Sequence, residues 1–219
     1  MNLKLLQLVS PALPVGAYSY SQGLEAAVES REIHDAASAQ RWIGDAMELS
    51  LSGMEAPVFL RLAEAWKAGD ASSVARWNEE FVASREGAEL RAETLQMGYS
   101  LRRLAHEIGI PGAGALDAFP ELAYPTAFTF AVSAWDIEPR EALAAYLFAW
   151  AENQVLAALK SVPLGQADGQ RMLLAIAARI PAIVGHAASL GDEELHNFAP
   201  GFALASSRHE TQYSRIFRS

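Results

Sequence analysis

The chain has 219 residues, of which 51% are hydrophobic and 20% charged, a composition typical of a folded soluble protein with one sizeable domain. Its formal net charge of −9 argues against a nucleic-acid binder, because neutralising phosphates requires a basic face. The chain contains no cysteine, which excludes disulfides, thiolate chemistry and thiolate metal sites.

The first ten residues do not resemble a targeting segment, because they hold one lysine and a short apolar run and are followed by Pro11 and Pro14. The two longest apolar stretches, 142–159 and 172–190, are interrupted by polar or charged side chains and fail as membrane spans. We therefore expect a soluble, cytoplasmic protein with neither a membrane nor a nucleic acid as partner.

Helical spacing of apolar residues recurs along most of the chain, and no convincing alternating strand is found. Residues 23–30 predict a short helix, and Ser38 is expected to cap the next one, which carries Leu49 among its inward residues. Pro57 suits the start of a further helix, which Gly69 would close.

Ser72 or Ser73 is expected to cap a longer helix, whose apolar stripe continues to Ile108. The Gly/Pro-rich interval Gly109–Gly114 ends this helix and predicts an exposed loop. Neither half of the chain carries a complete pattern of its own, so we predict a single domain over residues 1–219.

Glu138 and the proline after it predict the start of a long helix that is apolar almost all round and therefore central and buried. Asn153 and Gln154 within it need partners, since an unpaired buried amide costs about 1–3 kcal/mol, and we interpret them as a structural polar clasp. A break at 162–165 precedes a helix that Pro181 is expected to kink or split. The pattern predicts an all-α domain of about eight to ten helices.

The chain offers no self-contained catalytic or metal motif. None of its five histidines lies four residues from another, and neither a phosphate-binding glycine loop nor a nucleophile elbow is present. A single histidine can still bind a metal across a symmetric interface to which each chain supplies one ligand, and this alternative stays open for His209. We predict no catalytic residue, no cofactor and no metal site.

Two segments, one at each end, do not have the pattern of ordinary amphipathic helix. In the first, the polar-tipped side chains from Tyr18 to Gln22 lie between Gly16 and Gly23 and favour an interface, because tyrosine buries a large area at low entropic cost. The alternative is a capped helix entry, with Ser21 as the cap and the tyrosines in the core.

The second segment, within residues 205–219, places Tyr213, Ile216 and Phe217 among arginines. Because chain termini are usually disordered unless tied down, this composition indicates a tail that is held by contacts, and one possibility is that it docks onto another protein. The alternative is a tail that packs back on its own domain, and the residues alone favour neither.

Four stretches together have a specific pattern: Leu13-Pro-Val-Gly16, Tyr18-Ser-Tyr-Ser-Gln-Gly-Leu-Glu25, Lys160-Ser-Val-Pro-Leu-Gly-Gln166 and His209-Glu-Thr-Gln-Tyr-Ser-Arg-Ile-Phe-Arg-Ser219. They closely resemble the UreF family of urease accessory proteins, and weaker matches lie between residues 85 and 98. The resemblance runs from about Leu5 to Ser219, with Ile216 where leucine is common.

This resemblance implies an all-α homodimer that is not an enzyme. Such proteins bridge a nickel-carrying GTPase, UreG, to the urease-binding protein UreD (also called UreH), and the assembly delivers nickel to apo-urease with GTP hydrolysis by the partner. Their tail orders when the UreD-type partner binds. By motif position, Tyr18 and Arg215 match residues tied to the GTPase contact. The further contact residues expected are Ser19, Gln22, Glu25, His209, Glu210 and Tyr213.

Two rival functions stay open at this point. One is a helical enzyme with a pocket of Tyr18, Ser19 and a histidine, which a deep pocket with a strongly perturbed titratable group would favour. The other is a nickel carrier in its own right, which the scarcity of clustered ligands disfavours.

Overall fold

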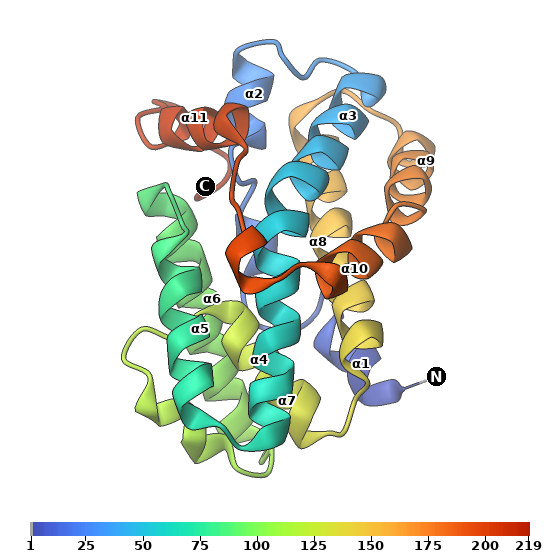
Figure 1. Ribbon diagram of the computed structural model, residues 1–219. Helices are drawn as coiled ribbons and strands as arrows, with labels where there is room; N and C mark the ends of the chain where they lie inside the picture. The colour runs from blue at the N-terminus through green and yellow to red at the C-terminus, as the bar shows by residue number, and fades with distance from the viewer. Residues whose placement is uncertain (1) are drawn as a thin grey trace.

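A computed structural model describes residues 2–219, and over this range the chain folds into α-helices joined by short turns, with no β-strand (Figure 1). The predicted all-α class is confirmed. The helices are α1 (Leu3–Leu8), α2 (Leu24–Glu29), α3 (Ala36–Ala46), α4 (Ala56–Ala68), α5 (Ala71–Ala83), α6 (Ala88–Glu107), α7 (Tyr124–Ala134), α8 (Pro139–Ser161), α9 (Gln166–Ala177), α10 (Ile180–Ser189) and α11 (Pro200–His209).

Helix α8 runs through the middle of the bundle and packs against α2, α3, α4, α9 and α10 (Figure 1). The helix starts directly after Glu138, as predicted, and the Glu138 carboxylate caps it by accepting from two backbone N–H groups of the first turn. Leu143 and Leu147 are fully buried. Phe148 and Leu156 remain more than one-third exposed, so the prediction of burial on every side is wrong. The neighbouring helices cover only part of the circumference of α8.

The predicted polar clasp on α8 is confirmed for Asn153. Its Nδ2 donates to the carbonyl oxygens of Ala17 at 2.9 Å and Tyr20 at 3.2 Å, which ties the N-terminal segment to the central helix. Gln154 is buried, and its amide nitrogen has no hydrogen-bond partner within the described residues. One of the two amides therefore carries the clasp.

Helices α3 and α4 are joined by a π-helical segment, Met47–Glu55. The cap of α3 is Asp35 and not Ser38: the Asp35 carboxylate accepts from the Ser38 N–H at 2.8 Å, and the Ser38 hydroxyl accepts from the Asp35 N–H. Leu49, expected to point inward, is exposed. The wider π turn shifts the phase of the side chains away from the 3.6-residue period on which that expectation rested.

The stretch after Gly69 forms two helices and not one. Asp70 caps α5, because its carboxylate accepts from the N–H groups of Ser72 and Ser73, each at 3.1 Å. These bonds together with those from both serine hydroxyls lower the pKa of Asp70 to about 2. The helix ends near Ser84, and α6 begins after Gly87, so the serines are first-turn residues and the predicted long helix is split.

Pro181 divides the last long apolar stretch into α9 and α10, as predicted. Two segments, Pro139–Ser161 and Gln166–Ser189, are long and apolar enough to span a membrane by length and composition alone. Half of the most apolar window in the first segment is buried inside the bundle, as in the core helix of a globular domain. This is weak evidence for a membrane protein.

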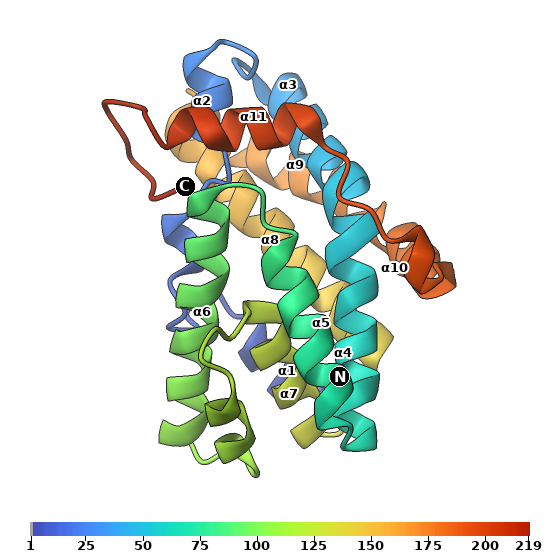
Figure 2. The ribbon, with the colours of Figure 1, turned by 60° about the vertical axis from the view of Figure 1, so that its left-hand side comes forward.

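Helix α11 lies across one end of the bundle, beside α2, and the last residues loop out and return toward α2 and the start of α6 (Figure 2). Helix α1 lies away from α11, in the other half of the bundle (Figure 1). The path of the tail therefore brings the first and the last motif of the chain together.

Candidate partner-docking site

The close approach of α11 to α2 depends on Gly23. This residue has φ +81°, a left-handed conformation that L side chains rarely adopt. A Cβ atom placed there would lie 2.8 Å from the backbone nitrogen of Ser206, inside van der Waals contact. The glycine that the sequence marks as a turn thus also seats α11 on the domain.

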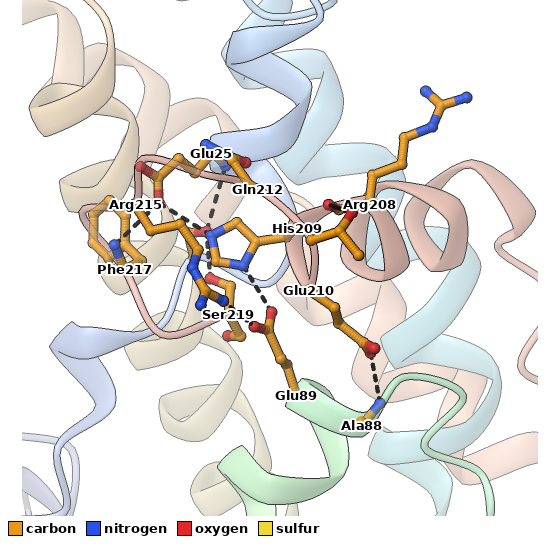
Figure 3. Close-up of polar contacts among 12 residues, drawn as sticks. Glu25, Ala88, Glu89, Arg208, His209, Glu210, Gln212, Arg215, Phe217 and Ser219 are labelled. Atoms are coloured by element: carbon orange, nitrogen blue, oxygen red, sulfur yellow. Dashed lines mark hydrogen bonds and ion pairs between the residues drawn. The ribbon is translucent and has the colours of Figure 1, made fainter.

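His209, the last residue of α11, joins two helices (Figure 3). Its Nδ1 lies 2.7 Å from the Glu89 carboxylate on α6, and its Nε2 lies 3.1 Å from the Glu25 carboxylate on α2. The side chain is fully buried. An imidazolium donates to both carboxylates at once, whereas a neutral ring donates to only one. We call Glu25, His209 and Glu89 the tail clasp, which is distinct from the polar clasp of Asn153 on α8.

Glu25 also holds the backbone of the tail. One of its oxygens accepts from the N–H of Ile216 at 2.7 Å, and the other accepts from the N–H of Phe217 at 3.0 Å. The Phe217 ring is buried, with Lys160 Nζ at 5.4 Å from the ring centroid. The buried carboxylate is therefore satisfied by donors that all come from the C-terminal segment.

The end of the tail pairs with the first motif. The carbonyl oxygen of Ser219 accepts from the N–H groups of Ser21 at 2.7 Å and Gln22 at 3.1 Å, and the Arg218 N–H donates to the Ser19 carbonyl at 2.8 Å. The Ser21 hydroxyl also donates to Ser219 and accepts from the Glu25 N–H. Of the two alternatives for the tail, packing back on its own domain is the one observed.

Beneath this junction lies Glu93 of α6, a buried carboxylate. The amide of Gln22 donates to it at 2.7 Å and the hydroxyl of Ser219 at 3.1 Å. Burial raises the pKa of Glu93 to about 7, against the opposing effect of these two hydrogen bonds. The Trp150 indole donates to the other end of the Gln22 amide at 2.7 Å, which fixes its orientation.

Other side chains of the two motifs face outward. Tyr18 is 65% exposed, and Tyr213 is fully exposed. Arg215 donates through Nη1 to the Glu89 carboxylate at 2.7 Å and keeps 40% of its side chain exposed. Glu210, at the end of α11, accepts from the Ala88 N–H at 2.8 Å and so satisfies a donor at the start of α6.

Six of the eight sequence-predicted contact residues make hydrogen bonds at the junction of the tail with the domain, and Tyr18 and Tyr213 are the two for which none is described above. The eight residues differ in how deeply they are buried. Tyr18, Tyr213 and Arg215 are accessible from outside, while Glu25 and His209 lie within the domain. The remaining three, Ser19, Gln22 and Glu210, are partly buried and engaged in the contacts described above. The capped helix entry expected for the first motif holds only in part: Tyr20 is buried but Tyr18 is exposed, and the N-cap of α2 is Gly23, not Ser21, whose hydroxyl accepts from the Glu25 N–H in the first turn of the helix. The interface interpretation of the exposed Tyr18 stays a prediction.

Two residues of this region, Glu89 and Glu93, were not singled out from the sequence. Glu93 lies three residues after Leu90 and four before Met97, on the apolar stripe of α6. An acidic residue within such a stripe is the signal that points to a buried partner. Glu89 carries no comparable signal, because its partners lie at the other end of the chain.

A cavity of about 90 Å³ is lined by residues of α5, α6, α7 and α8. Its polar lining includes Glu55, which accepts from the Tyr146 hydroxyl at 2.5 Å and the Arg85 guanidinium at 3.1 Å. Neither this cavity nor the next, of about 70 Å³ beside Tyr18, is lined by Ser19 or a histidine. The Tyr/Ser/His pocket of the enzyme hypothesis is therefore not assembled in either cavity, although Glu93, whose pKa burial raises to about 7, lines the first one.

No group of three or more metal-ligating side chains within residues 2–219 is arranged to hold a metal ion. The two carboxylates nearest His209 are engaged by the ring nitrogens, by the tail backbone and by Arg215. These contacts all join the C-terminal segment to α2 and α6 of the same chain.

Known proteins are similar to this chain over nearly its whole length. The UreF family model matches residues 33–177. A urease accessory protein UreF from Azoarcus sp. (strain BH72) is 57% identical over 222 aligned residues, covering 99% of this chain and 95% of the relative. This chain belongs to the UreF family.

Other UreF proteins are similar at comparable length. The protein from Dechloromonas aromatica (strain RCB) is 54% identical, covering 99% of this chain and 96% of the relative, and that from Methylobacillus flagellatus is 50% identical, covering 99% and 97%. The family model stops short of both end motifs, whereas these relatives align across nearly the whole chain. The UreF family is one of urease accessory proteins, a name that implies a supporting role in the maturation of another enzyme.

Proposed function

We propose that this chain is a non-catalytic scaffold for urease maturation. In this proposal a cytoplasmic homodimer of the chain bridges a UreG-type, nickel-carrying GTPase and a UreD/UreH-type accessory protein, and the assembly delivers nickel to apo-urease in a GTP-dependent manner. Membership of the UreF family supports the maturation role. The specific partners come from the family resemblance of the two end motifs.

One observation carries the docking part of the proposal. The tail is fixed to its own domain by buried contacts, yet it presents Tyr213, Ile216 and Arg215 to solvent. Aromatic, aliphatic and arginine side chains on a rigid support are the composition of an interface hot spot. The fold does not require these three side chains to be exposed, so contact with a partner protein is the simplest explanation for them.

Arg215 is proposed as an anchor that positions the GTPase, together with Tyr18. A catalytic arginine finger must reach the phosphates of the nucleotide, whereas the guanidinium here is bound to Glu89 of its own chain. The buried members of the predicted contact set, Glu25 and His209, would then act by holding the tail in place. The UreD-type partner would meet a surface already formed, in contrast to the ordering on binding that the resemblance implies.

The proposal is tested by assembly on a sizing column. Full-length protein and a version that ends at Ser206 are each mixed with the UreD-type and UreG-type partners. We expect only the full-length chain to form the larger complex. If the truncated chain assembles equally well, the tail is not the docking element; if neither chain assembles, the scaffold function itself is wrong. Circular dichroism of the truncated chain verifies that helices α1 to α10 remain, since the cut lies within α11.

A further inference from the structure

Four charged or ionisable side chains are linked by successive contacts: Glu25 to His209, His209 to Glu89, and Glu89 to Arg215 (Figure 3). Their exposed side-chain fractions are 8% for Glu25, 0% for His209, 15% for Glu89 and 40% for Arg215. With an imidazolium at His209 the charges alternate, and each neighbouring pair is 2.7–3.1 Å apart. Glu89 is the link between the buried half of this series of contacts and the exposed half.

The two oxygens of Glu89 have separate tasks. One lies 2.7 Å from His209 Nδ1, and the other accepts from Arg215 Nη1 at 2.7 Å. Because Glu89 lies in the first turn of α6, its backbone is held by a helix of 20 residues. Glu89 therefore belongs to the domain and not to the tail, and its carboxylate offers the guanidinium a hydrogen-bond acceptor outside the tail.

We propose that Glu89 is a positioning residue of the docking surface: it holds the Arg215 guanidinium ready for the GTPase partner and is itself oriented by His209. This inference rests on the proposed docking role of Arg215. Arginine has five N–H donors, and only the bond to Glu89 is made by the guanidinium within residues 2–219. The remaining donors are available to a carboxylate or carbonyl of the partner.

The physical advantage is pre-organisation. A free arginine side chain loses rotamer freedom on binding, and fixing it beforehand gains roughly two- to tenfold in affinity. The exposure of the pair places the expected gain in the lower half of this range, because solvent screens the contact. We expect Glu89→Gln to weaken GTPase binding about threefold to fivefold.

A double-mutant cycle tests this role in the full-length chain with the UreD-type partner bound. Affinity for the UreG-type GTPase is measured for the native chain, Glu89→Gln, Arg215→Ala and the double variant. We expect Glu89→Gln to have no further effect once Arg215 is removed. Losses that multiply would overturn the inference. Glu79→Gln, an exposed carboxylate of α5, serves as the control and should bind normally.

Hydrogen exchange separates positioning from a merely structural role. In Glu89→Gln the amides of Ile216 and Phe217 should stay protected, because their acceptor is Glu25. If these amides exchange freely, Glu89 acts by holding the tail and the inference is wrong. If Arg215→Ala binds normally, the docking role of Arg215 fails instead. If Arg215→Ala binds weakly but Glu89→Gln does not, only the role of Glu89 fails.

Discussion

The tail has an inner and an outer face, and the two faces differ in burial and in their contacts within the chain. His209, Phe217 and Ser219 are buried and make their hydrogen bonds or packing contacts within the chain. Tyr213 and Ile216 expose most of their side-chain surface. The inner face explains why the segment is folded, and the outer face has no explanation within the chain.

The first motif is divided in the same way. Tyr20 and Ser21 are buried against the domain, while Tyr18 stands out from it. Burial also raises the pKa of the Tyr20 hydroxyl. The comparison predicts that inner-face substitutions lower stability and docking together, whereas outer-face substitutions affect docking alone.

The largest effect is expected for Glu25→Ala. This change removes the acceptor of two tail amides and one of the two carboxylates at buried His209, leaving these groups unpaired. Breaking a buried ionic cluster costs about 3–5 kcal/mol, so the urea midpoint should fall clearly. Glu29→Ala, at the exposed end of α2, is the matched control and should stay within about 0.5 kcal/mol of the native chain. If Glu25→Ala and Glu29→Ala unfold at the same urea concentration, the contacts of Glu25 in the tail clasp do not stabilise the fold.

The next effect concerns pH. Because burial raises the pKa of Glu93 from 4.5 to about 7, the folded chain binds this proton more tightly than the unfolded chain. Its contribution, up to about 3 kcal/mol, is fully present below pH 4.5 and is lost as pH rises through 7. The free energy of unfolding, measured with urea at about pH 5 and about pH 8, should differ less between the two pH values in Glu93→Gln than in the native chain. An unchanged difference would mean that Glu93 does not titrate with folding.

A pair of glycines tests the seat of α11. Gly16 and Gly23 have φ values of +83° and +81°, but only Gly23 lies against another helix. Gly16→Ala should cost about 1 kcal/mol for the backbone alone, and Gly23→Ala about 2–3 kcal/mol because its Cβ also meets Ser206. The measurement is chemical unfolding of both variants. Similar losses would show that the approach of α11 to α2 adds no constraint.

The smallest effect on stability is expected on the outer face. Tyr213→Ala removes a fully exposed ring, so the unfolding free energy should change by less than about 0.5 kcal/mol. Binding of the UreD-type or UreG-type partner should nevertheless weaken. A large loss of stability, or unchanged binding to both partners, would remove Tyr213 from the docking face.

The helical class could be predicted from the sequence because helix periodicity and end signals are local. The exact helix starts were predicted wrongly where two neighbouring residues could both act as the cap. Ser38 and Asp35 both suit a cap of α3, and the reciprocal hydrogen bonds that make Asp35 the cap are visible only in the structure. Leu49 was misplaced because nothing in the sequence announced the π-helical segment around it.

The candidate site was predictable as two motifs but not as one junction. Ser21 and Ser219 meet across 198 positions of sequence, and no local pattern predicts that contact. The same separation hid the roles of Glu25 and His209, which the family resemblance gave only as expected contact residues. Two polar residues within apolar stretches were readable signs of buried polar partners: Glu93 in the stripe of α6 and Asn153 in α8.

The most direct test of the division between the two faces is Arg215→Ala, measured in two ways on the same preparation. Its urea midpoint should match that of the native chain, because the tail amides and His209 keep Glu25 as a partner. Its affinity for the UreG-type GTPase, in the presence of the UreD-type partner, should fall at least tenfold, in the range of an interface anchor. Native affinity would contradict the account, and so would weak binding accompanied by an unfolded tail.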